Sequence, residues 1–338
     1  MEISLQSARQ VFCDVAEATD AAAARRAVVH CAEQIGMAES ERSNVAISVT
    51  EMATNVIKHA SRGKIIVDSI RQNGSCGLRI LALDKGPGIS NIATALEDGR
   101  SSAGTAGNGL GAIRRLATRF DIYSYPAKGT CVLAEFWPGA VPKTGSDIEV
   151  GVVSVPFPGE SVSGDGWSSR TVPGGLLLML ADGLGHGFYA AEAAREAERL
   201  VNETTSTSPA VILQDVHDAL RKTRGAAVAV AAMDCENGRL CFAGVGNISA
   251  TLLTRQNSRG MASHNGTAGH EVRKVQEFAF PWNPDNLLVM HSDGLSGRWD
   301  LGDYPGLWNK PSSVIAAVLY RDFARGRDDA TILVAKGV

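Results

Sequence analysis

Three polar residues in the segment SVTEMATNVIKHA have a spacing that could serve chemistry. Glu51, Asn55 and His59 follow one another at intervals of four residues, so a helix would place them on one face. A carboxylate and an amide one turn apart can hold a hard cation with its waters, and the carboxylate could also accept a proton from a nucleophile. Such a pair, taken alone, belongs more often to a solvated helix face.

Two glycine-rich segments farther along the chain could hold a nucleotide. In LALDKGPGIS, Asp84 ends an apolar run and precedes Gly86 and Gly88, where the backbone can come close to a flat ligand. The Asp84 carboxylate could accept a hydrogen bond from an exocyclic amine, although a simple turn explains the residue as well. The segment GTAGNGLGAIRRLA has four glycines that precede or open an expected helix, namely Gly104, Gly107, Gly109 and Gly111. Free N–H groups at such a helix start can face phosphates.

Four aspartates in the second half of the chain occupy turn contexts: Asp165, Asp182, Asp293 and Asp328. Asp182 and Asp293 end apolar runs and precede glycine, and Asp328 precedes another strand-like run. Carboxylates at strand ends can converge at one sheet edge, where the carbonyl of Gly183 adds an oxygen ligand. Without a Cys/His cluster, such a set favours Mg²⁺ or Mn²⁺ over zinc. Two ions about 3.5–4 Å apart can activate water for attack on a phosphoryl group, although a single Asp-Gly is more often only a turn.

Hydrophobic periodicity predicts the elements that position these residues. The first half reads as α+β, with helices near 21–36, 39–60 and 110–118 and strands near 11–15, 64–70, 78–83, 121–125 and 130–136. The second half is richer in strands, predicted near 150–155, 176–181, 226–233, 240–245, 250–253, 275–278, 286–291 and 331–335, with helices over 188–202, 209–223 and 312–323. Strands with a few long helices predict stacked sheets covered by helices.

Length and composition limit the class of protein. A chain of 338 residues suggests about two domains, and the proline- and glycine-containing stretch PGAVPKTGSDIE separates them. We predict domains over 1–140 and 150–338, joined by a linker over 141–149. The 33 Lys and Arg against 36 Asp and Glu argue against a dedicated nucleic-acid binder, which would have a basic excess.

The same composition bears on the compartment. The longest apolar run, 226–233, is too short to span a bilayer, and the N-terminus shows no signal-peptide pattern. The six cysteines form no Cys-x-x-Cys pair, which favours reduced thiols. We therefore expect a cytoplasmic protein with no membrane and no nucleic-acid partner.

The motifs of the first half, in this order and spacing, resemble the N, G1 and G2 boxes of the Bergerat-fold (GHKL) ATPases over roughly residues 8–137. The short form without dimerisation helices is similar to the anti-sigma-factor serine kinases, and more narrowly to the switch kinase of the bacterial stressosome. The resemblance implies that Glu51 is the general base, that Asn55 holds magnesium and that Asp84 recognises adenine. It implies an ATP site formed by Asn55, Asp84, Gly86, Gly88, Gly107, Gly109, Leu110, Gly111 and Thr130.

The acidic motifs resemble the metal-dependent PPM serine/threonine phosphatases over about residues 148–336, closest to the compact sporulation and sigma-factor regulatory branch. The resemblance implies two Mn²⁺ or Mg²⁺ ions held by Asp165, Asp182, Gly183, Asp293 and Asp328, with Asp329 a weaker candidate. His186, in GLGHG, is better explained as a helix-start residue that packs locally. Some eukaryotic members clamp the substrate phosphate with an arginine near the start of the domain, and Arg170 is a poor match for it.

These resemblances imply a two-domain α+β protein, with a Bergerat-fold α/β sandwich ATPase domain followed by a PPM-type α-β-β-α sandwich. We expect a bifunctional regulator of a bacterial partner-switching pathway. An ATP-dependent serine kinase module and a phosphoserine/phosphothreonine protein phosphatase would act on a STAS-domain anti-sigma antagonist or a stressosome-like protein.

Three alternatives to this function stay open. The first module could be a non-catalytic ATP-binding clamp on a partner, or a nucleotide sensor, or both sites could be vestigial in a scaffold. A histidine kinase is disfavoured because no separate phosphoacceptor helix precedes Glu51.

Overall fold

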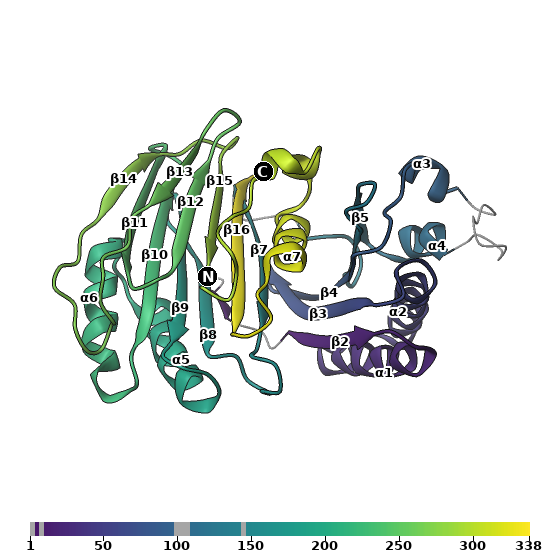
Figure 1. Cartoon of the computed structure of the whole chain (residues 1–338), viewed down its shortest axis with the longest axis horizontal. Coiled ribbons are helices and arrows are strands. Elements are labelled where there is room, and N and C mark those ends of the chain that lie inside the picture. The colour runs from purple at the N-terminus through teal and green to yellow at the C-terminus, as the bar shows by residue number, and fades with distance from the viewer. Residues whose placement is uncertain (1–3, 7–9, 98–108, 143–146) are drawn as a thin grey trace. The chain divides into compact units, whose positions relative to one another are not determined.

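The computed structural model describes residues 4–6, 10–97, 109–142 and 147–338 (Figure 1). These residues form two compact units. The first unit holds the described residues from 10 to 142 together with 300–321, and the second holds 4–6, 147–299 and 322–338. A segment from late in the sequence therefore folds with the first half, and a strand from the start of the chain folds with the second half.

One five-stranded antiparallel sheet forms the base of the first unit. Its strands are, in spatial order, β2 (Val11–Val15), β3 (Gly63–Gln72), β4 (Ser75–Asp84), β6 (Thr130–Phe136) and β5 (Arg119–Ser124). The helices are α1 (Ala18–Gln34), α2 (Glu39–Ala60), the short α3 (Ile92–Ala95) and α4 (Gly109–Leu116). Helices α1, α2 and α4 share one hydrophobic core with one face of this sheet.

Helix α2 separates an apolar face from a polar one. Val45, Val49, Met52 and Val56 are buried in that core, and their spacing of three and four residues is that of one helical stripe. The intervening positions include Glu51, on a different face. At the N-terminus of α2, the Glu41 carboxylate accepts a hydrogen bond from the Ala38 N–H at 2.9 Å, which is one half of a capping box.

The segment 300–321 is tied to the first unit by cations. It contains η2 (Leu301–Asp303), η3 (Leu307–Asn309) and most of α7 (Ser312–Phe323). Lys310 Nζ lies 2.7 Å from Asp121 Oδ1 on β5, and Lys128 Nζ donates to the Asp303 carbonyl at 2.6 Å. Arg321, near the end of α7, donates from Nη1 to the Asp84 carbonyl oxygen at 3.2 Å.

The second unit has two antiparallel sheets. The six-stranded sheet has the order β1 (Ser4–Gln6), β8 (Asp165–Val172), β9 (Gly175–Gly183), β10 (Ala226–Asp234), β11 (Arg239–Val245) and β14 (Phe278–Pro281). The five-stranded sheet has the order β13 (Ser258–Met261), β12 (Ser249–Leu253), β15 (Leu287–His291), β16 (Ala330–Gly337) and β7 (Ile148–Val155).

The two sheets share one hydrophobic core, and helices cover the six-stranded sheet on its other side (Figure 1). Leu178, Leu180 and Phe242 from the six-stranded sheet share the core with Leu288 and Met290 from the five-stranded one. The covering helices are α5 (Phe188–Glu203) and α6 (Pro209–Ala219), which continues into η1 (Leu220–Lys222). Alanines of α5 in this cluster allow the helix to lie close to the strands.

Most predicted elements agree with the structure, but the sequence prediction misses β1, α3, β8 and β13 and misplaces part of one strand. Strand β8 is not revealed by hydrophobic periodicity, because its buried residues include Ser168, Ser169 and Arg170; the strand lies between β1 and β9. The predicted strand over 275–278 is wrong for its first three residues, since β14 begins at Phe278. The six cysteines are all free thiols.

In the described part of the chain, no helix combines the length and the apolar character needed to cross a membrane.

Candidate functional sites

Helices α2 and α4 bring the predicted base and magnesium ligand against the glycine-rich helix start. A Cβ atom placed on Gly109 would lie 2.9 Å from Glu51 Oε2 and 3.4 Å from Asn55 Nδ2. Both side chains therefore reach the first residue of α4, where backbone N–H groups are free to bind an anion. Leu110 and Gly111 follow in the same turn, whereas Gly107 lies outside the described residues.

Asp84 is held at the end of β4 by two backbone donors. The N–H groups of Gly86 and Thr130 donate to its Oδ1 at 2.8 and 3.2 Å, and the register of β4 and β6 places Thr130 directly opposite. One carboxylate oxygen is thus fixed, and Oδ2 is left to accept from a ligand. Burial raises the pKa of Asp84, and the two backbone hydrogen bonds offset part of that effect.

The loop after β4 is pinned close to this carboxylate. Gly88 has φ +75°, and a Cβ there would meet the Tyr125 carbonyl oxygen at 2.2 Å, so only glycine fits. Ser124 Oγ accepts from the Ile89 N–H at 2.7 Å and lies 2.9 Å from Thr130 Oγ1. Asp84, Gly86, Gly88 and Thr130 therefore lie in one cluster.

An open groove of about 530 Å³ lies between α1 and α2 and has Glu51 in its wall. Arg25, Arg42 and Thr50 also line it, together with Ile47, which is half exposed.

The aspartates of the second unit lie at one end of its two sheets. Asp165 begins β8 and stands directly opposite Asp182 of β9 in the antiparallel register. Asp293 follows β15, and Asp328 precedes β16, and these two strands are paired. A Cβ on Gly183 would meet the Ala190 carbonyl oxygen at 2.2 Å, so the turn after Asp182 needs glycine.

Ser292 connects the two sheets at this end. Its hydroxyl donates to Asp165 Oδ2 at 2.7 Å and accepts from the Thr331 N–H at 3.0 Å. Asn247, in the loop between β11 and β12, donates from Nδ2 to Asp293 Oδ2 at 2.8 Å. Neither residue stands out in the sequence. The only signal for Ser292 is that it directly precedes Asp293.

Burial and mutual repulsion raise the pKa values of Asp165, Asp182 and Asp293. Burial raises the pKa of Asp165 to about 7, and the charges of Asp329 and Asp328 add to the effect. Burial raises the pKa of Asp182 to about 9, followed by repulsion from Asp165, Asp293, Asp328 and Asp329. Burial and Asp328 also raise the pKa of Asp293. The five carboxylates are therefore within charge–charge range of one another.

The donor set fits divalent cations. Among the described residues, Asp165 Oδ1 is buried without a hydrogen-bond partner, and a buried carboxylate oxygen normally has one. In the same part of the chain, the side chains do not already form a tight group of three or more His, Cys, Asp or Glu around one point. Oxygen ligands of this kind suit Mg²⁺ or Mn²⁺, and a cation would relieve the repulsion that raises the pKa values.

Two neighbours of this cluster have structural partners. Asp329 Oδ1 accepts from the Phe157 N–H at 2.8 Å, so this carboxylate anchors a loop. His186 stacks on Phe157 with ring centroids 4.4 Å apart, and its Nδ1 lies 3.0 Å from Glu160 Oε1. These contacts agree with local packing as the role of His186.

Two family descriptions match the chain. The description "Histidine kinase-like ATPase domain" matches residues 15–136, and "Stage II sporulation protein E (SpoIIE)" matches residues 173–337. Serine/threonine-protein kinase RsbT of Bacillus subtilis (strain 168) is 33% identical over 118 residues, which are 35% of this chain and 89% of RsbT. Phosphoserine phosphatase RsbX of the same strain is 24% identical over 139 residues, 41% of this chain and 70% of RsbX.

Solved structures resemble the second half of the fold. One of them comes from a structure titled "The bacterial stressosome: a modular system that has been adapted to control secondary messenger signaling". It is 28% identical, with a TM-score of 0.53, and the match covers 56% of this chain and 99% of that one. The crystal structure of RsbX with magnesium has 22% identity and a TM-score of 0.50, over 56% of this chain and 96% of RsbX. At 22% identity, the similarity to RsbX shows the fold alone.

The fold predicted from the sequence is confirmed: a two-domain α+β protein with a GHKL ATPase domain and a PPM phosphatase fold. The chain belongs to the histidine kinase-like ATPase family through its RsbT-like domain, to which a SpoIIE-type phosphatase domain is fused.

Proposed function

We propose that this chain phosphorylates and dephosphorylates a serine of one partner protein in a stressosome-type partner switch. The observation that carries the proposal is that Asp165 faces Asp182 across β8 and β9, and that the charges of Asp293 and Asp328, from the other sheet, act on Asp182. Its relatives RsbT and RsbX are named as a serine/threonine-protein kinase and a phosphoserine phosphatase, and both activities would reside here in one polypeptide. The partner we propose is a STAS-domain protein.

In the phosphatase domain, Asp165, Asp182, Asp293, Asp328 and the Gly183 carbonyl would hold two Mn²⁺ or Mg²⁺ ions. Bound ions would supply an activated water and neutralise charge on the phosphoryl group. Ser292 and Asn247 fix the carboxylates of Asp165 and Asp293 by hydrogen bonds. Small rotations of the remaining side chains would complete the ligand shell.

In the ATPase domain, Asp84 Oδ2 would accept a hydrogen bond from the adenine amine. The N-terminus of α4 would face the phosphates, and Asn55 would hold the Mg²⁺ that accompanies ATP. Glu51 lies beside the first residue of α4 and would take the proton from the hydroxyl of the substrate serine. The serine oxygen would bond to the γ-phosphorus as the bond from that phosphorus to the β–γ bridging oxygen breaks, and ADP would leave. The groove beside Glu51 would admit the serine-bearing segment.

The test uses the full chain and a STAS-domain protein recovered with it by co-purification. With Mg²⁺ and radiolabelled ATP, label should pass to a serine of the partner; with Mn²⁺ and no ATP, the same label should be released as inorganic phosphate. Absence of Mn²⁺-dependent release would contradict the phosphatase assignment. Absence of transfer with intact ATP binding would favour the clamp, in which the first domain binds its partner without phosphorylating it. Glu51→Gln separates a kinase from a clamp, because a clamp would still bind and sequester its partner, whereas a kinase would lose phosphoryl transfer.

A further inference from the structure

Arg224 lies beside the turn that contains Asp182. It sits in the connection between η1 and β10. Its guanidinium covers the Tyr189 ring at 4.8 Å from the centroid. A Cβ on Gly185 would lie 3.3 Å from Arg224 Nη1, so the cation also touches the glycine turn that follows Asp182. Cation–π stacking of this kind holds a guanidinium in place while leaving its in-plane N–H groups available.

The backbone around Arg224 is fixed on both sides. The Leu184 N–H donates to the Gly225 carbonyl at 3.0 Å, which joins the glycine turn directly to the arginine connection. His270 Nε2 lies 2.8 Å from the Arg224 carbonyl oxygen. Gly225 has φ +77°, and a Cβ there would meet the Ala268 carbonyl oxygen at 2.6 Å, so this tight approach requires glycine.

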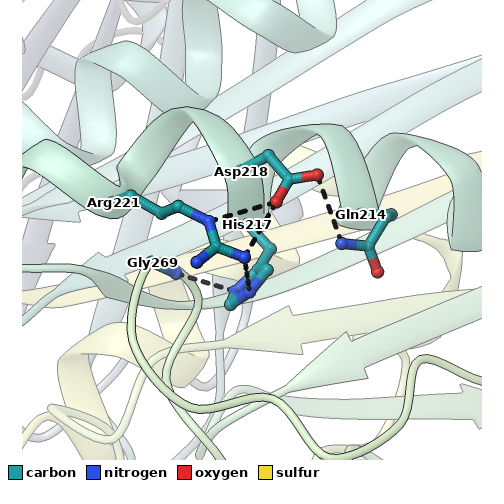
Figure 2. A network of polar contacts seen from close by, with 5 residues as sticks. All are labelled: Gln214, His217, Asp218, Arg221 and Gly269. Carbon is teal, nitrogen blue, oxygen red and sulfur yellow. Dashed lines mark hydrogen bonds and ion pairs between the residues drawn. The ribbon is translucent and has the colours of Figure 1, made fainter.

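The loop that supports Arg224 is itself anchored to α6. The Gly269 N–H donates to Nδ1 of the buried His217 at 3.0 Å, as Figure 2 shows. On the same helix, Arg221 is bound to Asp218 at 3.2 Å. The network of Figure 2 therefore fixes the loop that supports the connection between η1 and β10, and it pairs the charge of Arg221 with Asp218.

Arg224 has a charge that the protein does not use. The residue is exposed, and in the part of the chain that the structure describes its guanidinium forms no salt bridge. Arg325, another exposed arginine near the aspartates, is committed differently, because its charge lowers the pKa of Asp293. Arg224 is thus free to receive an anion beside the glycine turn that follows Asp182.

Large apolar side chains are exposed in the segment that Arg224 covers through Tyr189. Leu184, Phe188 and Tyr189 are 47%, 65% and 57% exposed, and they belong to the glycine turn and the first turn of α5. Exposed apolar groups concentrated in one place mark protein contacts. Their continuity with the turn after Asp182 indicates that the protein bound here carries the phosphate.

We propose that Arg224 binds the phosphate of the phosphoserine substrate, and that Leu184, Phe188 and Tyr189 bind the polypeptide around it. The assignment rests on the proposed phosphatase function. The guanidinium presents a planar pair of donors that matches phosphate oxygens.

The test compares the full chain with Arg224→Ala in Mn²⁺-dependent hydrolysis of p-nitrophenyl phosphate. Loss of a charge-assisted pair should raise KM, and the inhibition constant of inorganic phosphate, about 10- to 100-fold, with kcat changed less than about 3-fold. Arg224→Lys should recover part of the loss. Arg259→Ala, which removes another exposed arginine stacked on an aromatic ring, that of Phe280, is the matched control and should behave as wild type.

Three results would overturn the assignment. The first is an unchanged KM and an unchanged inhibition constant of phosphate in Arg224→Ala. The second is a raised Mn²⁺ concentration for half-maximal activity in that variant, which would mean that Arg224 only supports the turn, and the third is an inhibition constant that rises in Arg325→Ala but not in Arg224→Ala. Calorimetric binding of inorganic phosphate to the Mn²⁺-loaded chain gives a readout without turnover. If wild type binds phosphate in an Arg224-dependent way but hydrolyses nothing, the proposed function fails and the binding role stands.

The apolar contact is tested separately with phosphorylated casein as substrate. The double substitution Leu184→Ser, Phe188→Ser should raise KM for casein about 10-fold and leave KM for p-nitrophenyl phosphate unchanged. Equal effects on both substrates, or no effect on casein, would contradict a protein-binding surface.

Discussion

The two candidate sites of this chain use opposite materials, because they would bind ligands of opposite charge. Within the described residues, the first offers a helix N-terminus, a loop with Gly86 and Gly88, and the two carboxylates of Glu51 and Asp84, the second of which is fixed by backbone N–H groups. The second concentrates five aspartates whose charges repel one another. A phosphate-rich ligand needs donors and close backbone, whereas divalent cations need concentrated oxygen charge.

The sites also differ in how the chain assembles them. Glu51 and Asn55 are one turn apart on α2, so most of the first site's geometry is local. The second site takes its carboxylates from the ends of β8, β9, β15 and β16, which belong to two sheets. Loss of one aspartate should therefore affect a cooperative cation site strongly, and loss of one nucleotide contact should have a graded effect.

The largest effect is expected for Asp182→Asn. Removing this charge should weaken binding of both ions and lower Mn²⁺-dependent phosphatase turnover on the order of 10⁴-fold, since a metal ion contributes several kcal/mol to such a transition state. ATP binding by the first domain, measured by calorimetry, should stay at its wild-type value. Phosphatase turnover that persists in this variant would contradict a cooperative cation site and, with it, the contrast drawn between the two sites.

Glu51→Gln is expected to have the next largest effect. Loss of a general base lowers phosphoryl transfer on the order of 10³-fold, while ATP affinity and phosphatase turnover should be retained. Transfer is measured with radiolabelled ATP and the co-purified partner. Glu41→Gln, which changes only the N-terminal cap of α2, serves as the matched control. A kinase rate that does not depend on Glu51 would remove the proposed role of this residue.

Gly109→Ala should have a moderate and selective effect. The new Cβ would lie 2.9 Å from Glu51 Oε2, so the carboxylate must move, whereas alanine suits a helix better than glycine. A displaced base should lower transfer about 10-fold, with unchanged or raised thermal stability. A variant that unfolds, or one with full activity, would contradict the contact between α4 and Glu51.

The smallest effect concerns the pH dependence of stability without metal. The folded-state pKa values of about 7 for Asp165 and about 9 for Asp182 lie above the ordinary aspartate value near 3.9. Folded protein therefore holds protons that the unfolded chain has lost, and stability should fall as pH rises from about 5 to 9.

The transition to follow by calorimetry of the metal-free chain is the one whose midpoint temperature Mn²⁺ changes. Its midpoint should fall as pH rises, by roughly 2–4 °C for each kcal/mol of lost stability. Asp182→Asn should flatten the dependence. Added Mn²⁺ should stabilise more at pH 8 than at pH 6, because protons compete with the metal. A midpoint temperature that rises with pH in the metal-free chain would show that the aspartates are not buried together.

Much of the first site could be predicted from the sequence for a physical reason. Helical periodicity converts the spacing of Glu51 and Asn55 into a shared face, and glycines before a helix indicate a backbone anion site. The helix over 39–60 begins and ends at the predicted residues. The contact between Gly109 and Glu51, by contrast, depends on how α4 packs on α2.

The sequence marked the four aspartates by their flanks but did not pair them. Antiparallel register decides that Asp165 faces Asp182, and β8 itself is hidden because its polar residues are buried between two strands. Ser292, Asn247 and Arg224 have no pattern of their own, since each matters through residues far away in the chain.

By itself, the sequence determined two domains, their fold classes and the chemistry that each can perform, because residue type and local periodicity are properties of short segments. Only the tertiary structure decided that 300–321 folds with the first unit, that burial raises the pKa values of Asp165 and Asp182, and that Arg224 stacks on Tyr189 beside the turn after Asp182. Those outcomes depend on desolvation and on contacts between distant segments, which no local pattern encodes.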